Sequence, residues 1–232
     1  MQPGGIYKEA WALYKRFWNH FIPIALIIFL IVAVASLLLV LAAGWAGAVF
    51  AAILGLVGTF WLQGAIAEAV ADVRDGRVDL SVGETINRVS PFVGRLGAAG
   101  LLAAFAIAVG LVLLIVPGLV LLTWWVLIAP VIVLERRGVF ESFGRSRELV
   151  RGHGWQVFGA IVIGFLIFVA ARVVVAIVLV WLPDWLRTLL DSLVANAVIA
   201  PFIAAAWTLM YFHLRGEPAT EVAPEPSPVT PM

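Results

Sequence analysis

The chain has 232 residues, of which 63% are hydrophobic and 12% are charged. Soluble domains contain about 45–50% apolar and about 25% charged residues, so this chain has too few polar side chains to cover a water-soluble globule. The net charge of +1 is too small for a nucleic-acid-binding domain, and the absence of cysteine excludes disulfides, cysteine–zinc sites and thiol nucleophiles. The composition predicts a multi-pass integral membrane protein.

The first uncharged stretch covers residues 21–67 and contains no Asp, Glu, Lys or Arg over 47 residues. A membrane-spanning helix needs about 20 apolar residues, so the stretch holds two helices and a reversal. Gly44 and Gly47 mark the reversal, and Trp45 between them suits a membrane interface. We expect spans over about 21–43 and 47–71.

The second uncharged stretch covers residues 96–134 and is interrupted by the turn signal Pro117-Gly118. We expect spans over about 96–116 and 118–134. The second of these is short, so it either crosses the membrane or re-enters on the same side.

The third hairpin has spans over about 155–182, whose only charged residue is Arg172, and about 186–212, and Pro183-Asp184 separates them. The predicted fold is thus an all-α membrane domain, residues 1–215, with about six transmembrane helices in three hairpins. Residues 216–232 contain five prolines and three glutamates, a composition that predicts a disordered tail.

The basic residues give the orientation. With the N-terminus in the cytoplasm, 13 of the 15 Lys and Arg residues lie on that side, and Arg187 alone lies outside. Because cytoplasmic loops carry an excess of Lys and Arg, we expect a plasma (inner) membrane protein with both termini in the cytoplasm.

Three cytoplasmic segments, 9–18, 84–93 and 141–150, each begin with a glutamate and carry apolar residues two, eight and nine positions later. This spacing lines one face of a helix and predicts an amphipathic helix along the inner interface before each hairpin. The unit of one interfacial helix and one hairpin thus occurs three times. Either duplication or the pattern shared by all interfacial helices explains it.

Four short motifs carry a resemblance to a known family. They are Ile-Val-Pro-Gly-Leu at 115–119, the runs 129–139 and 142–152, and the end of the last span at 204–215. Over residues 5–215 the chain resembles the membrane domain that is fused to some glycerophosphoryl diester phosphodiesterases and also stands alone in uncharacterised bacterial proteins. The resemblance implies a six-helix membrane fold without phosphodiesterase activity, which belongs to a separate soluble barrel domain.

No catalytic, cofactor-binding or metal-binding residue is indicated. The histidines, His20, His153 and His213, have no metal-ligand spacing, and the sequence contains no H-E-x-x-H, G-x-S-x-G or phosphate-loop motif. We therefore expect a protein that is not an enzyme and has no cofactor.

The arginine-rich third segment is the candidate for lipid-headgroup contacts, through Arg145, Arg147 and Arg151. The planar guanidinium suits phosphate. Two other readings stay open: the arginines act as topology signals, and Arg145 pairs with Glu141 one turn away.

Polar residues within the spans are candidates for intramembrane contacts: Gln63, Glu68, Arg172, Asp191 and Asn196. Arg172 lies roughly 15 Å from the outer end of its predicted span, where an arginine costs at least about 2.5–3.5 kcal/mol. We expect it to contact Asn196 or Asp191 rather than lipid.

The function predicted from these features is non-catalytic: the protein organises or handles lipids, anionic ones included, or a partner protein, at the inner leaflet. The alternatives are a small transporter or permease component and, third, an intramembrane enzyme. No nucleic-acid partner is expected. A polar cavity that reaches the midplane would favour transport, whereas a groove open to the inner leaflet would favour lipid handling.

Overall fold

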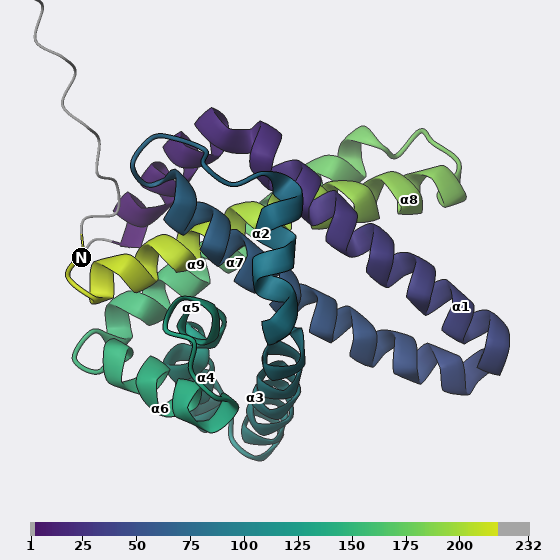
Figure 1. Cartoon of the computed structure of the whole chain (residues 1–232). Helices are drawn as coiled ribbons and strands as arrows, with labels where there is room; N and C mark the ends of the chain where they lie inside the picture. The colour runs from purple at the N-terminus through teal and green to yellow at the C-terminus, as the bar shows by residue number, and fades with distance from the viewer. Residues whose placement is uncertain (1–2, 218–232) are drawn as a thin grey trace, which may run out of the picture.

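The computed structural model describes residues 3–217, and every regular element in that range is a helix (Figure 1). Five of these helices are long and apolar enough to cross a membrane. The chain is therefore an all-α membrane protein. Apart from Gly216 and Glu217, the tail predicted at 216–232 lies outside the described residues.

The helix α1 (Pro3–Val73) is a hairpin rather than one straight rod. Its backbone leaves the helical region at Gly44, with φ 54° and ψ −124°, and the ribbon folds back on itself there (Figure 1). Positive φ suits glycine, which has no Cβ. A Cβ at Gly47 would overlap the carbonyl oxygen of Leu39, so glycine also permits the close approach of the two arms. The single element α1 thus contains both apolar arms of the first hairpin.

A second break in α1, at Phe17, sets off its N-terminal segment. Ile6, Tyr7 and Ala10 on this segment are buried, whereas Trp11 and Trp18 are more than half exposed. Phe17 is buried, so Trp11, Phe17 and Trp18 do not share one environment as the aligned pattern predicts. The difference arises because the segment packs one face on the rest of the protein.

The next elements are α2 (Val82–Val89), a 3₁₀ turn (Ser90–Phe92) and α3 (Val93–Leu113). A capping box starts α2: the backbone N–H of Glu84 donates to Ser81 Oγ at 3.3 Å, and the N–H of Ser81 donates to Glu84 Oε2 at 2.8 Å.

The second hairpin turns at Leu114, which is extended, three residues before the predicted Pro117-Gly118 turn. Pro117 lies in the first turn of α4 (Ile115–Trp125), where a missing N–H removes no helical hydrogen bond. A Cβ on Gly118 would collide with Leu111. The pair Pro117-Gly118 therefore belongs to the packed start of α4 and not to the turn.

The predicted span 118–134 is divided into α4 and α5 (Ile128–Leu134) by a non-helical Leu127. Pro130 lies in the first turn of α5 and cannot donate to the carbonyl four residues earlier, which is the physical reason for the break. The two pieces together still form one apolar candidate span, Ile115–Leu134.

The last elements are α6 (Val139–Val150), α7 (Gly154–Val178), α8 (Asp184–Val194), a π-helix (Ala195–Ile199) and α9 (Ala200–Leu214). The predicted span 186–212 is helical throughout, because α8, the π-helix and α9 follow one another without a break, and the apolar candidate span within them is Leu190–Leu214. Pro201 follows the π-helix and lacks the N–H that a regular helix would use at that point.

The buried core lies where α9 packs against both arms of α1 and where α5 closes over them. From this base the α1 hairpin and the α3–α4 hairpin project in different directions (Figure 1). Their far ends are exposed, as at Leu41 and Val112, which are 74% and 86% accessible. In a membrane, exposed apolar side chains of this kind face lipid.

The predicted orientation can be tested with single cysteines, because the chain has none of its own. Ala43, Val78 and Gly144 are exposed, at the tip of the α1 hairpin, before α2 and on α6. Ala43→Cys should react with a membrane-impermeant maleimide added to intact cells, whereas Val78→Cys and Gly144→Cys should react only after permeabilisation. Labelling of the last two in intact cells would contradict the predicted orientation.

Candidate functional site

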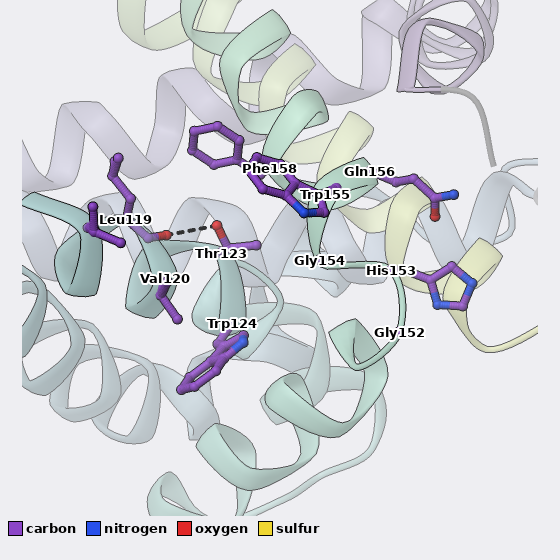
Figure 2. Close-up of a pocket in the computed structure, with 11 residues that line it drawn as sticks. Leu119, Val120, Thr123, Trp124, Gly152, His153, Gly154, Trp155, Gln156 and Phe158 are labelled. Atoms are coloured by element: carbon purple, nitrogen blue, oxygen red, sulfur yellow. Dashed lines mark hydrogen bonds between the residues drawn. The ribbon is translucent and has the colours of Figure 1, made fainter.

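A groove with a volume of about 710 Å³ lies between α4 and the beginning of α7 (Figure 2). We call it the α4–α7 groove. One wall is the face of α4, and the other is the start of α7 with the turn before it. Its lining residues are Val116, Leu119, Val120, Thr123, Trp124, Gly152, His153, Gly154, Trp155, Gln156 and Phe158.

The α4 wall of the groove is hydrocarbon. Its polar side chain, Thr123, donates its hydroxyl hydrogen to the carbonyl of Leu119 at 2.8 Å (dashed in Figure 2). The remaining α4 residues that line the groove are aliphatic, apart from Trp124. The wall therefore suits an apolar ligand and offers little to a polar solute.

The opposite end of the groove is polar, at the turn from α6 into α7. Gly152 has a φ of +86°, which lets the chain turn there, and His153 and Gln156 follow it. The Oε1 atom of Gln156 is shielded from solvent and accepts no hydrogen bond from the described part of the chain. A buried acceptor without a donor is costly, so Gln156 is the polar lining residue whose hydrogen bonding is incomplete within the described residues.

The structure separates the three predicted headgroup arginines. The Arg147 guanidinium lies 4.2 Å from the centre of the Trp124 ring, which lines the groove. Arg151 is exposed, directly precedes Gly152, and has no side-chain partner within residues 3–217. Arg147 thus contacts a residue of the groove lining, and Arg151 precedes another lining residue in the chain.

Arg145 has a different role. It donates to Glu135 at 3.1 Å and to Glu148 at 2.9 Å, and not to Glu141 as the one-turn spacing suggested. Glu141 instead accepts the backbone N–H of Gly138 and closes the start of α6. Arg145 is thus committed to ion pairs inside the protein.

Glu135 is the centre of a polar network that sequence reasoning missed. Its carboxylate accepts hydrogen bonds from Arg137 at 2.9 Å, from Arg145, and from the hydroxyl of Tyr211 at 3.1 Å. The side chain is only 11% exposed. The available signal was its position as the first charge after the 39 uncharged residues of the second hairpin. Glu135 connects the end of α5 to α6 and to α9.

The environment of Glu135 acts on its pKa in both directions. Burial raises the pKa, but hydrogen bonds from Arg137, Arg145 and Tyr211 and the charge of Arg145 outweigh burial and hold the pKa below the ordinary value. Glu135 is therefore ionised at neutral pH.

The network continues from α9 to the end of α1. Arg215 donates to the Tyr211 hydroxyl at 2.8 Å and pairs with Glu217 at 3.0 Å. Glu217 also pairs with Arg74 at 3.1 Å, and the Arg74 guanidinium lies 3.9 Å from the centre of the Phe212 ring. Charged side chains thus connect the end of α9, the end of α1 and Glu217.

Arg172 pairs with Asp191 at 2.6 Å, one of the two contacts expected for it. Its depth differs from the expectation, because α7 ends at Val178 rather than at residue 182. Arg172 therefore lies roughly 9 Å from the end of α7 instead of 15 Å. Asn196, the other expected partner, lies in the π-helix and makes no side-chain hydrogen bond to any described residue.

The remaining intramembrane candidates stay apart from this pair. Glu68 pairs with Arg88 at 3.4 Å, and Gln63 has no side-chain hydrogen bond within the described range. In residues 3–217 no three His, Asp or Glu side chains are grouped so that they could hold a metal ion.

The chain is similar to a UPF0259 membrane protein of Pectobacterium carotovorum, with 30% identity over 158 residues. The match covers 67% of this chain and 62% of that protein, so it spans less than two thirds of the relative's length. No family model matches the chain, and no solved structure matches it.

The resemblance to the glycerophosphoryl diester phosphodiesterase membrane domain is wrong. No family model supports it, and the relative found is a UPF0259 membrane protein. The motifs that suggested it are apolar runs with turn residues at their ends, such as Val-Pro-Gly at 116–118, which begins α4. Any hairpin of membrane helices needs such residues, so they carry little family information. What the comparison and the fold define together is a multi-pass helical membrane protein.

Replacing Glu135 by Gln should destabilise the protein by roughly 1–3 kcal/mol, because the charge that holds Arg137 and Arg145 is lost. Since its folded pKa is lowered, the carboxylate contributes fully above the ordinary glutamate pKa of about 4.3, and its contribution disappears as the pH falls through the folded value. Thermal unfolding of the detergent-solubilised protein at several pH values measures both effects. Glu148→Gln, at an exposed position, is the control, and an equal loss in both variants would contradict the central role of Glu135.

Proposed function

We propose that the protein is a non-catalytic lipid-binding protein of the plasma membrane. It holds a phospholipid of the inner leaflet with an acyl chain in the α4–α7 groove and the phosphate beside Arg147 and Arg151. The groove itself carries the proposal, because it joins a hydrocarbon wall to a polar, arginine-flanked end.

The wall matches an acyl chain in chemistry and in length. Between Val116 and Trp124 the helix rises by roughly 12 Å, which is long enough for a large part of a chain to lie against it. The groove opens beside Trp155, which is 87% exposed, so a lipid can enter from the membrane without crossing a polar barrier.

The polar end matches a phosphate headgroup. A guanidinium offers paired N–H donors to phosphate oxygens, and Arg151 has all of its donors free of described partners. Attraction to an anionic leaflet adds about 1 kcal/mol per basic residue. The Gln156 oxygen can accept a hydrogen bond from a headgroup hydroxyl or ammonium group.

The same proposal includes the arrangement in the membrane. The two arms of α1, then α3, α4 with α5, α7, and the π-helix with α9 form six crossings, and both termini lie in the cytoplasm. The N-terminal segment of α1, α2 and α6 lie along the inner interface, where their charged residues meet headgroups.

A transporter of polar solutes is less well supported, because the α4 wall of the groove is apolar. An intramembrane enzyme has no supporting arrangement of side chains in the described range. A partner protein on the exposed hairpin ends is compatible with lipid binding and does not replace it.

The test is the amount of phospholipid that remains with the purified protein, measured by mass spectrometry. Arg147→Gln combined with Arg151→Gln should reduce the retained anionic phospholipid by about tenfold or more, because two attractive charges are lost. Val120→Trp, which fills the groove, should reduce retained phospholipid of every headgroup type.

Two matched controls keep the result specific. Arg77→Gln combined with Arg95→Gln removes two exposed charges on the same predicted side, and Val112→Trp enlarges an exposed side chain on α3. Both controls should retain lipid as the wild type does. Unchanged lipid in Val120→Trp, or an equal loss in the charge control, would contradict a lipid site in the α4–α7 groove.

A further inference from the structure

A second groove, of about 700 Å³, lies between the last half of α7 and α8. We call it the α7–α8 groove. It is separate from the first: Phe158 lines the α4–α7 groove and Phe168 lines this one, roughly 15 Å further along the same helix. Under the proposed topology the two grooves lie in opposite leaflets.

Each helix presents one face to this groove. Phe168, Arg172 and Ala176 follow one another at intervals of four residues on α7, and Arg187 and Asp191 have the same interval on α8. Residues four apart lie on one side of a helix. The α7 face is hydrocarbon except for Arg172, whereas α8 contributes one positive and one negative side chain.

The lining therefore carries two guanidinium groups and one carboxylate. Asp191 Oδ2 forms an ion pair with Arg172 Nη2 at 2.6 Å, and among the described side chains its second oxygen and the other Arg172 N–H groups have no hydrogen-bond partner. Arg187 pairs with Asp184 at 3.0 Å, but the Asp184 side chain is 91% exposed, and such surface pairs are weak. Within the described side chains, the groove thus offers donors to an anion and an acceptor to a cation.

An arginine within an apolar helix is expensive to keep. Arg172 lies roughly 9 Å inside the end of α7, and an ionisable residue at such a place commonly marks a binding site or pathway. The ion pair with Asp191 neutralises Arg172, whereas Arg187, beside the same hydrocarbon floor, is paired with Asp184, whose side chain is 91% exposed. The groove thus holds one close ion pair and one arginine whose partner is exposed to solvent.

We propose that the α7–α8 groove binds a phospholipid with a zwitterionic, primary-amine headgroup, such as phosphatidylethanolamine. Arg172 and Arg187 hold the phosphate, Asp191 accepts a hydrogen bond from the ammonium group, and an acyl chain lies along Phe168 and Ala176. A quaternary ammonium has no N–H to donate, and a glycerol headgroup has no positive charge. The site therefore prefers phosphatidylethanolamine over both phosphatidylcholine and phosphatidylglycerol.

The experiment uses the full-length protein in lipid nanodiscs that contain photoreactive acyl-chain analogues of these three lipids. After irradiation, digestion and mass spectrometry locate the cross-links. For the wild type, the yield within residues 165–178 should be several-fold higher with phosphatidylethanolamine than with the other two lipids. Equal yields for the three would overturn the proposal.

Two variants separate the phosphate contact from the ammonium contact. Arg187→Gln leaves the Arg172–Asp191 pair intact and should lower the yield for all three lipids, by about tenfold for phosphatidylethanolamine. Asp191→Asn keeps an oxygen acceptor for Arg172 and should remove the preference for phosphatidylethanolamine while the phosphatidylglycerol yield is kept. If Asp191→Asn does not fold, the cross-linking yield of Arg187→Gln and the lipid preference of the wild type still test the proposal. An unchanged yield in Arg187→Gln would overturn the site.

Two further measurements test whether the ligand is a lipid and whether the α7–α8 groove binds it independently of the α4–α7 groove. Free phosphoethanolamine should not compete, because it lacks the acyl chain that the α7 face binds; complete competition would mean a soluble ligand and would overturn a lipid site. Arg147→Gln combined with Arg151→Gln should leave cross-linking at residues 165–178 unchanged. The amount of retained anionic lipid therefore tests the α4–α7 groove, whereas the cross-linking yield at residues 165–178 tests the α7–α8 groove, so the two proposals can fail separately.

Discussion

The carboxylate of Glu135 is the constraint on which the arrangement of the described helices depends most. It is nearly buried at the end of an apolar helix, where an unpaired charge would be strongly unfavourable, and three donors from separate segments compensate it. Those donors fix α6 and α9 relative to α5. Because Tyr211 also accepts from Arg215, and Arg215 and Arg74 share Glu217, the end of α1 joins the same network.

This polar base explains why the apolar hairpins can diverge. In lipid there is no hydrophobic force that presses one apolar helix against another, so the far ends of the hairpins need no mutual contact. Burial in this protein is accordingly uneven: α9 and the inner ends of α1 are buried, whereas the far halves of α3 and α7 are exposed. Grooves remain where the helices separate, and each has charged residues on or beside its lining.

The arginines show how tertiary contacts divide residues that look equivalent in sequence. Arg145 and Arg147 are two positions apart on α6, so they point in different directions, and one meets Glu135 while the other lies over Trp124. Only the second is directed to the α4–α7 groove. The four short motifs that suggested a phosphodiesterase-associated domain misled for a related reason: they record where helices start and turn, which hairpins of unrelated proteins share.

The sequence by itself determined the class of this protein and most of its apolar helices, because uncharged runs of about 20 residues are dictated by the thickness of the bilayer. It also indicated the reversal at Gly44 and the contact between Arg172 and Asp191, since a glycine turn and a membrane arginine each restrict the backbone or partner that fits. Only the tertiary structure decided the turn at Leu114, the break before α5, the π-helix between α8 and α9 and the role of Glu135. These features depend on which surfaces meet, and residues far apart in the chain, such as Glu135 and Tyr211, carry no local pattern that reveals their contact.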